Sequence, residues 1–318
     1  MQSPGRKISI IGAGAVGTSI AYAALIRGVA RTVALMDINA DKVLAEVLDL
    51  SHGLEFVPRA EVIGSSDPAV CADSDVVIFT AGAKQRPGQT RLELAEATIE
   101  LVRTALPPIV EVAPAARYVM VTNPVDVITY AAGKITGLPR NQLFGSGTVL
   151  DSSRLRFLVS EHCGVAVQNV HAYIAGEHGD SEIPLWSSAS IGGVPLLDWE
   201  PLDGGRLLDA AARATIKQEV VQAAYRIIEG KGATNYAIGL ATARIAEAIV
   251  NNEHRVLPVS SLIEEDFHGI SDVCLSLPTL VDAAGAGPRL PIAMSADELA
   301  GLRRSADTLK EMQARFGL

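Results

Sequence analysis

The stretch Ile8-Ser9-Ile10-Ile11-Gly12-Ala13-Gly14-Ala15-Val16-Gly17, followed by Thr18–Arg27, predicts a strand, a tight turn and a helix. In a GxGxxG motif, each glycine has its own structural role. Gly12 permits the sharp turn, Gly14 lets a pyrophosphate approach the backbone, and Gly17 lets the helix pack on the strand. The N-terminus of the helix would then face the phosphates. Because strands also end in glycine for steric reasons alone, the motif needs a second observation.

That second observation is Asp37, which ends the next apolar strand, Thr32–Met36. It stands twenty residues after Gly17, a separation that suits a carboxylate bonded to an adenosine ribose 2′-hydroxyl. No arginine stands beside Asp37, and its charge would repel a 2′-phosphate. We therefore expect the dinucleotide to be NAD rather than NADP.

The charge and cysteine content of the chain argue against several classes of protein. The 318 residues carry 27 basic and 36 acidic side chains without a basic block, so a nucleic-acid partner is not expected. Cys71, Cys163 and Cys274 are odd in number and far apart, which fits neither a disulfide framework nor a CxxC metal site, and predicts a reducing cytoplasm. The apolar Ile8–Ile26 resembles a signal peptide or membrane anchor, but its glycine spacing favours a strand and a helix.

Strands and helices alternate up to residue 147, which predicts an open, doubly wound parallel sheet, the Rossmann class of α/β fold. Further strands are expected at Glu61–Gly64, Asp75–Thr80, Tyr118–Thr122 and Leu143–Ser146. Ligands of such sheets gather at the carboxyl ends of the strands. In this chain those ends carry Gly12–Gly17, Asp37, Gly82, Asn123 and Ser146.

Residues 148–318 predict a second, α+β substrate domain that packs on residues 1–147 without a flexible linker. We expect a strand at Val170–Ala175, an antiparallel ribbon from Arg255–Leu262 and Asp272–Leu280, and helices at Ser152–Cys163, Arg206–Glu229, Thr234–Asn251 and Ala296–Phe316.

Three segments carry residues suited to acid/base chemistry. His178 lies between two glycines in GEHGD and would transfer protons near neutral pH, unless it is an ordinary core or surface histidine. A metal site is not expected, because the nearest histidine, His171, does not match HExxH spacing. Asp151 and Arg154 share a helix face, where they would orient the histidine and grip a carboxylate, or else satisfy the helix dipole and solvent.

The polar segment AKQRPGQTR, residues 83–91, follows a buried strand and has a Pro-Gly turn in its middle. Such a segment is typical of a mobile lid, although many surface loops have the same composition. Arg91 stands at its far end, from which it would polarise a carbonyl oxygen on closure.

Seven features in this order resemble the NAD-dependent L-lactate/malate dehydrogenase family over essentially the whole chain, with most similarity to its bacterial L-lactate dehydrogenases. They are GAGAVG, Asp37, AGAKQRPGQTR, TNPVD, LDSSRLR, GEHGD and KGATNYAIGLA. The resemblance implies hydride transfer between NADH and pyruvate in a homotetramer. It assigns His178 as acid/base, Asp151 as its partner, Arg154 to the substrate carboxylate and Arg91 to the ketone. Further positions implied at the substrate are Asn123 and Thr234, and at the cofactor Val16, Lys42, Gly82, Ala83, Thr104, Thr122, Asn123, Ser146 and Ile238.

The resemblance implies that substrate choice depends on Gln85, six residues before Arg91. Malate dehydrogenases of this family place an arginine there, which pairs with the second carboxylate of oxaloacetate. A neutral glutamine would leave that charge unpaired in a closed site and so favours pyruvate. If the loop were bulged by one residue, Arg86 would face the substrate and favour malate. Branched 2-oxo acids also remain open, because one glutamine does not define a pocket volume.

Two further alternatives stay open at this point. Arg156 and His171 match positions that bind fructose 1,6-bisphosphate in allosteric bacterial relatives, although non-allosteric relatives can keep similar residues. A dinucleotide sensor could retain the fold without activity. The set His178, Asp151, Arg154 and Arg91 argues against a sensor, which needs no proton donor.

Overall fold

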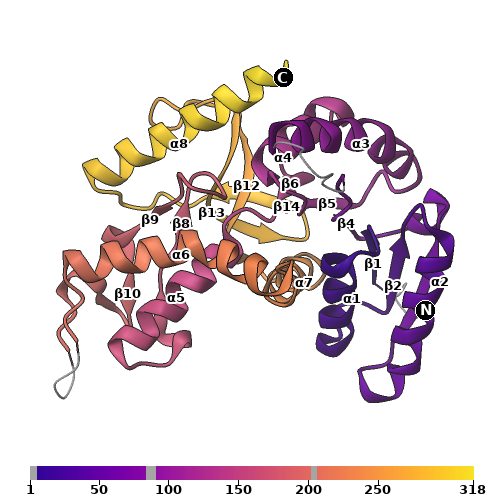
Figure 1. The fold of residues 1–318 in the computed structure, drawn as a ribbon, viewed down its shortest axis with the longest axis horizontal. Coiled ribbons are helices and arrows are strands. Elements are labelled where there is room, and N and C mark those ends of the chain that lie inside the picture. Colours follow the sequence, from indigo (N-terminus) through magenta and orange to yellow (C-terminus); the bar gives the residue numbers. More distant parts are fainter. Residues whose placement is uncertain (1–5, 84–90, 202–205) are drawn as a thin grey trace.

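The computed structural model describes residues 6–83, 91–201 and 206–318, and its largest element is a nine-stranded sheet. The strand order is β14-β13-β12-β6-β5-β4-β1-β2-β3 (Figure 1). These strands are β1 (Lys7–Ile11), β2 (Thr32–Met36), β3 (Glu61–Ser65), β4 (Val76–Phe79), β5 (Arg117–Met120), β6 (Leu143–Gly145), β12 (Arg255–Ile263), β13 (Val273–Asp282) and β14 (Gly285–Arg289). The helices are α1 (Ala15–Arg27), α2 (Ala40–His52), α3 (Arg91–Val112), α4 (Val125–Thr136), α5 (Val149–Cys163), α6 (Ala210–Lys231), α7 (Tyr236–Val250) and α8 (Ala296–Arg315).

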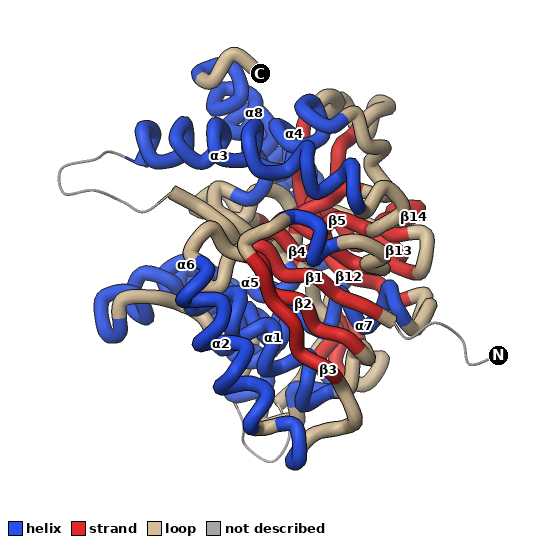
Figure 2. Tube along the Cα trace, turned by 90° about the vertical axis from the view of Figure 1, so that its right-hand side faces the viewer, coloured by secondary structure: helices blue, strands red, loops and turns tan. Residues whose placement is uncertain are grey.

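The first six strands form the expected doubly wound Rossmann unit. They are parallel, and the chain runs outward from β1 through β2 to β3 before it returns to β4, β5 and β6 on the other side. Figure 2 shows α1 and α2 on one face of these strands and α3 and α4 on the other. The direction of winding reverses between β1 and β4, which is where such sheets bind their ligands.

The C-terminal ribbon continues the same sheet. β12 and β13 pair antiparallel over nine residue pairs, and β12 joins β6 through Ser260 and Gly145. The ribbon was expected, but its third strand, β14, was not, because Gly285–Arg289 has no apolar alternation that marks a strand. The two halves of the chain therefore share one sheet.

Further details differ from the sequence-based expectations. The single strand expected at Val170–Ala175 is two short strands in different sheets. β7 (Val170–His171) pairs with β10 (Ser190–Ile191), which also pairs with β11 (Val194–Pro195), and β8 (Ile174–Ala175) pairs with β9 (Ile183–Pro184). The helix expected from Arg206 begins at Ala210, because the side chain of Asp209 accepts the Ala212 N–H and caps it.

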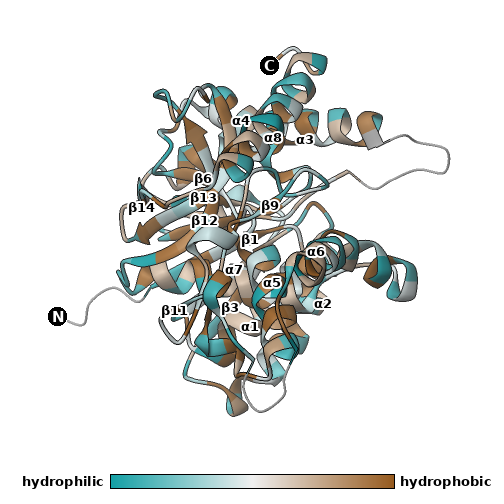
Figure 3. Ribbon diagram, turned by 90° about the vertical axis from the view of Figure 1, so that its left-hand side faces the viewer, coloured by the Kyte–Doolittle hydropathy of each residue, from teal (hydrophilic) through white to brown (hydrophobic). Residues whose placement is uncertain are grey.

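Hydrophobic residues fill both faces of the sheet and the space beneath α5 and α6. In Figure 3 the outer helices, such as α2 and α6, mix hydrophilic and hydrophobic residues along their length. Cys71, Cys163 and Cys274 are buried thiols without disulfide bonds. None of the helices among the described residues has both the length and the apolar character needed to span a bilayer.

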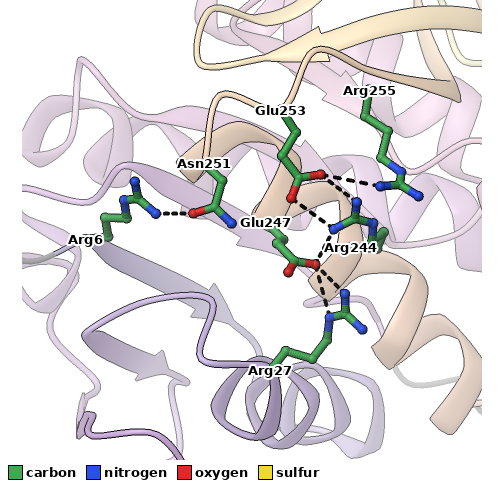
Figure 4. Close-up of polar contacts among 7 residues, drawn as sticks. All are labelled: Arg6, Arg27, Arg244, Glu247, Asn251, Glu253 and Arg255. Atoms are coloured by element: carbon green, nitrogen blue, oxygen red, sulfur yellow. Dashed lines mark hydrogen bonds and ion pairs between the residues drawn. The ribbon is translucent and has the colours of Figure 1, made fainter.

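Helix α7 of the second half packs directly on α1 of the first half. A Cβ atom at Gly239 would lie 2.9 Å from the backbone of Ser19, so only glycine permits this close approach. At the far end of α7, Glu247 pairs with both Arg27 and Arg244, and Arg244 also binds Glu253 at 2.5 Å (Figure 4). The network thus links α1 to the end of α7.

Replacing Glu247 with glutamine should lower the free energy of unfolding by about 1 to 2 kcal/mol at pH 7. Burial alone would raise the pKa of Glu247, but Arg27 and Arg244 outweigh it and lower the pKa. The charged pair therefore stabilises the fold above the ordinary glutamate range, and this contribution disappears as pH falls through the lowered pKa. Urea unfolding at pH 7 and below pH 4, with and without 1 M salt, measures the effect.

A matched control is Glu100→Gln, whose pair with Arg103 is exposed on α3. We expect almost no change there. An equal loss in both variants, or a loss for Glu247→Gln that persists in acid, would contradict the role given to this network.

Candidate active site

The glycine-rich turn after β1 has the geometry of a dinucleotide cradle. Gly12 has φ +101°, in the region open to glycine, and its N–H donates to Met36 O at 2.7 Å. A Cβ atom at Gly17 would lie 1.9 Å from Gly12 O, so helix and turn touch there, whereas a Cβ atom at Gly14 would meet open space. Asp37 reaches back to this turn and accepts the Ala13 N–H at 2.9 Å. The residues present therefore fit a dinucleotide.

The other residues expected at the cofactor differ in where they lie and in how far they are exposed. A Cβ atom at Gly82 would lie 2.8 Å from Thr122, whose hydroxyl donates to Ala81 O, so the ends of β4 and β5 meet. Ser146 is buried, and its backbone N–H donates a hydrogen bond to the carbonyl oxygen of Met120, the last residue of β5. Among the remaining positions, Val16, Ala83 and Ile238 are partly buried, whereas Lys42 on α2 and Asn123 after β5 are exposed. Thr104 is also exposed, and its hydroxyl donates to carbonyl groups of α3.

Gly14 and Gly17 provide a matched test of this cradle. Gly14→Ala should fold normally and raise the Kd for NADH by about 10- to 100-fold, because a methyl group enters the space for the pyrophosphate. Gly17→Ala should instead lower the free energy of unfolding by roughly 1 to 3 kcal/mol through overpacking. Fluorescence titration with NADH and thermal unfolding separate the two effects. A destabilised Gly14→Ala with unchanged affinity would contradict this division.

The proton-transfer residues expected from sequence converge on one buried carboxylate. Asp151, in the first turn of α5, is 2% exposed. One of its oxygens lies 2.5 Å from Nδ1 of His178, and the other accepts a hydrogen bond of 2.6 Å from Arg154. Asp151 thus orients the imidazole from one side and the guanidinium from the other.

This arrangement controls the charge of the imidazole. Burial alone would lower the pKa of His178, but the charge and hydrogen bond of Asp151 outweigh it and raise the pKa to about 9. Burial acts to raise the pKa of Asp151, and the charges of His178 and Arg154 reverse that effect and lower it. At neutral pH the imidazole of His178 is therefore cationic and has a proton that it can donate, and Asp151 is an anion.

The loop that carries His178 is held by residues of three elements, and none of these residues was given a role from the sequence. Asp126 on α4 accepts the His178 N–H at 2.7 Å, Ser305 on α8 accepts the Glu177 N–H at 2.8 Å, and Gly176 exchanges backbone hydrogen bonds with Ser276 on β13. Because α4 follows β5, these contacts place His178 at the carboxyl edge of the sheet. An acid inside the apolar run Val125-Asp126-Val127-Ile128 was the available signal for Asp126.

Asp126 is 2% exposed, and burial raises its pKa to about 6. A second buried acid, Glu182, lies just beyond the loop and was also missed. One ligand-type atom each from Asp151, His178 and Glu182 lie within 4.8 Å of one another. Arg154 and His178 already satisfy both oxygens of Asp151, so we interpret the cluster as an ion pair with a further buried acid beside it rather than a cation site.

The other expected residues lie outside this cluster or outside the described residues. Gln85 and Arg86 lie outside the described residues, and Arg91 is described only as the first residue of α3. Thr234 is partly buried in the turn between α6 and α7. Arg156 donates from Nε to Ala172 O at 2.8 Å and lies over the Tyr173 ring, while the neighbouring His171 is exposed.

Comparison with known protein families gives two adjoining matches. The NAD binding domain of lactate/malate dehydrogenase matches residues 6–145, and the alpha/beta C-terminal domain of the same family matches residues 148–315. The chain belongs to the lactate/malate dehydrogenase family. This assigns the Gly12–Gly17 cradle to an NAD-binding domain and confirms the expected oxidoreductase class and cofactor.

Individual relatives of this dehydrogenase agree over nearly their full lengths. An L-lactate dehydrogenase of Bifidobacterium animalis subsp. lactis is 57% identical, with 98% of this chain and 97% of the relative covered. An L-lactate dehydrogenase of Moorella thermoacetica is 47% identical, with 100% and 99% covered. A crystal structure of a lactate dehydrogenase from a deep-sea metagenome library superposes with a TM-score of 0.94 at 36% identity, covering 98% of this chain and 99% of that one.

Proposed function

We propose that this chain is an NAD-dependent L-lactate dehydrogenase that interconverts pyruvate and L-lactate. The observation that carries the proposal is the cluster in which one buried aspartate binds both His178 and Arg154. A cationic imidazole beside a guanidinium suits a substrate with a carboxylate next to a ketone. Gln85 supports pyruvate, because a neutral amide offers no countercharge to a second carboxylate.

Separate groups of the chain bind the cofactor, bind the substrate and transfer the proton. Gly12–Gly17 and Asp37 would hold the dinucleotide, which would supply the hydride in its reduced form, NADH, and accept it in its oxidised form, NAD+. Arg154 binds the substrate carboxylate, and Arg91 polarises the ketone. His178, held by Asp151, donates its proton to the carbonyl oxygen in reduction and accepts it again in oxidation. Asn123 and Thr234 complete the pocket wall.

The test is an NADH-oxidation assay with pyruvate, oxaloacetate and a branched 2-oxo acid measured side by side. Turnover of pyruvate with little response to oxaloacetate supports the proposal. Faster turnover of oxaloacetate would make the chain a malate dehydrogenase, and preference for the branched acid a broader 2-hydroxy acid dehydrogenase. NADH binding without turnover of any of the three would leave a dinucleotide sensor.

We also propose that fructose 1,6-bisphosphate activates the enzyme through Arg156 and His171. The support is their proximity, since Arg156 bonds to the carbonyl of the residue next to His171. Facing cationic groups in an assembly would repel one another until a bisphosphate bound. A pyruvate saturation curve that does not move on adding the sugar bisphosphate would exclude this role.

A homotetramer in the cytoplasm is part of the same proposal. Large apolar side chains are exposed on the helices of one sheet face, namely Tyr22 and Ile26 on α1 and Leu44 and Leu48 on α2, with Phe56 beyond α2. Exposed apolar surface of this kind favours contact with another protein surface. Light scattering during gel filtration should give four times the 33.4 kDa chain mass, and a monomer would contradict the assembly.

A further inference from the structure

A buried acid beside the active pair has no function in the mechanism above. Glu182 stands before β9 and is 3% exposed. Its Oε1 atom is buried and has no hydrogen-bond partner within the described parts of the chain. One of its oxygens lies within 4.8 Å of atoms of both Asp151 and His178. An ionised carboxylate without a donor is strongly disfavoured in such a place.

The charges around Glu182 come from three elements. Asp151 and Arg154 belong to α5, His178 belongs to the loop that precedes Glu182, and Lys217 belongs to α6. Burial and the charge of Asp151 raise the pKa of Glu182 to about 9, although His178, Arg154 and Lys217 act to lower it. At neutral pH this side chain is a neutral carboxylic acid.

We propose that Glu182 is a positioning residue that must keep its proton for an anionic substrate to bind at Arg154. This inference rests on the proposed function. An ionised Glu182 would place a second anion beside Asp151. Its charge would weaken the electrostatic attraction between Arg154 and the substrate carboxylate. Binding of the substrate and ionisation of Glu182 therefore oppose each other, and by linkage the bound anion strengthens the hold of Glu182 on its proton. In alkaline solution the binding of pyruvate takes up one proton at His178 and another at Glu182.

The main experiment counts these protons with oxamate, an unreactive analogue of pyruvate. Calorimetric titration of oxamate into the enzyme–NADH complex at pH 9, in buffers of different ionisation enthalpy, gives the uptake. Glu182→Gln should take up about half as many protons as the unmodified chain. The alkaline limb of log kcat/KM for pyruvate should fall with a slope near two in the unmodified chain and near one in Glu182→Gln.

Two variants make the comparison specific. Glu182→Asp keeps a titratable carboxyl and should restore the second proton. Glu161→Gln removes an exposed carboxylate from the far end of α5 and should leave the proton count as it is in the unmodified chain. Equal uptake in the unmodified chain and Glu182→Gln would overturn the proposal, and so would an acid shift of the whole profile in Glu182→Gln, which would mean that Glu182 is ionised at neutral pH.

A measurement without substrate separates this inference from the proposed function. Because the folded chain holds a proton that an unfolded glutamate releases near its ordinary pKa, Glu182 makes the fold less stable as pH rises from 5 to 9. The Tm of Glu182→Gln minus the Tm of the unmodified chain should therefore increase as pH rises over this range. A constant difference would overturn the inference even if pyruvate is turned over. A growing difference without pyruvate turnover would instead make the proposed function wrong.

Discussion

Replacing His178 with asparagine should lower kcat for pyruvate reduction by roughly 10³- to 10⁴-fold. Asparagine can still donate a hydrogen bond to the ketone oxygen, but it has no proton to transfer. The negative charge that develops on that oxygen during hydride transfer then has no donor to neutralise it. Stopped-flow measurement of NADH oxidation at saturating pyruvate tests the chemical step directly.

The Kd for NADH should be almost unchanged in the same variant. His178 is anchored through its backbone by Asp126 and through its ring by Asp151, and neither residue belongs to the glycine-rich cradle. Fluorescence titration with NADH provides this control. Unchanged turnover would exclude His178 as the proton donor, and a loss of NADH affinity equal to the loss in turnover would indicate a structural defect instead.

Replacing Gln85 with arginine should shift the ratio of kcat/KM for oxaloacetate over that for pyruvate by about a thousandfold or more. The new guanidinium would pair with the second carboxylate of oxaloacetate in a closed site, where an unpaired charge is strongly disfavoured. In the same place it would face only the methyl group of pyruvate, and the loss of its own hydration would then be uncompensated. Initial rates with both 2-oxo acids measure the ratio.

Arg86→Gln is the matched control for this switch, because it removes the neighbouring guanidinium. If Gln85 faces the substrate, Arg86→Gln should leave the substrate preference unchanged. If the loop is shifted by one residue, Arg86→Gln should instead abolish whatever activity the unmodified chain has towards oxaloacetate. A Gln85→Arg variant that still ignores oxaloacetate would contradict the specificity argument.

Local sequence patterns were sufficient for the doubly wound half of the fold. The turn at Gly12 requires a positive φ, the helix at Gly17 requires the absence of a Cβ atom, and strands buried on both faces require continuous apolar runs. Each of these requirements acts within a few residues along the chain. The motif order from Gly12 to Lys231 then identified the family, which the comparisons confirm.

The tertiary structure alone decided how the second half completes the site. Asp126 and Ser305 each hold the histidine loop from more than 50 residues away in the chain, and β14 joins the sheet without a strand pattern of its own. The apolar run around Asp126 indicates that this acid is buried, but nothing in the sequence indicates which group it binds, because the partners are brought together only in the packed chain. The sequence determined which groups carry charge and hydrogen bonds. Burial and distance determined that Asp151 is an anion and that Glu182, beside it, keeps its proton.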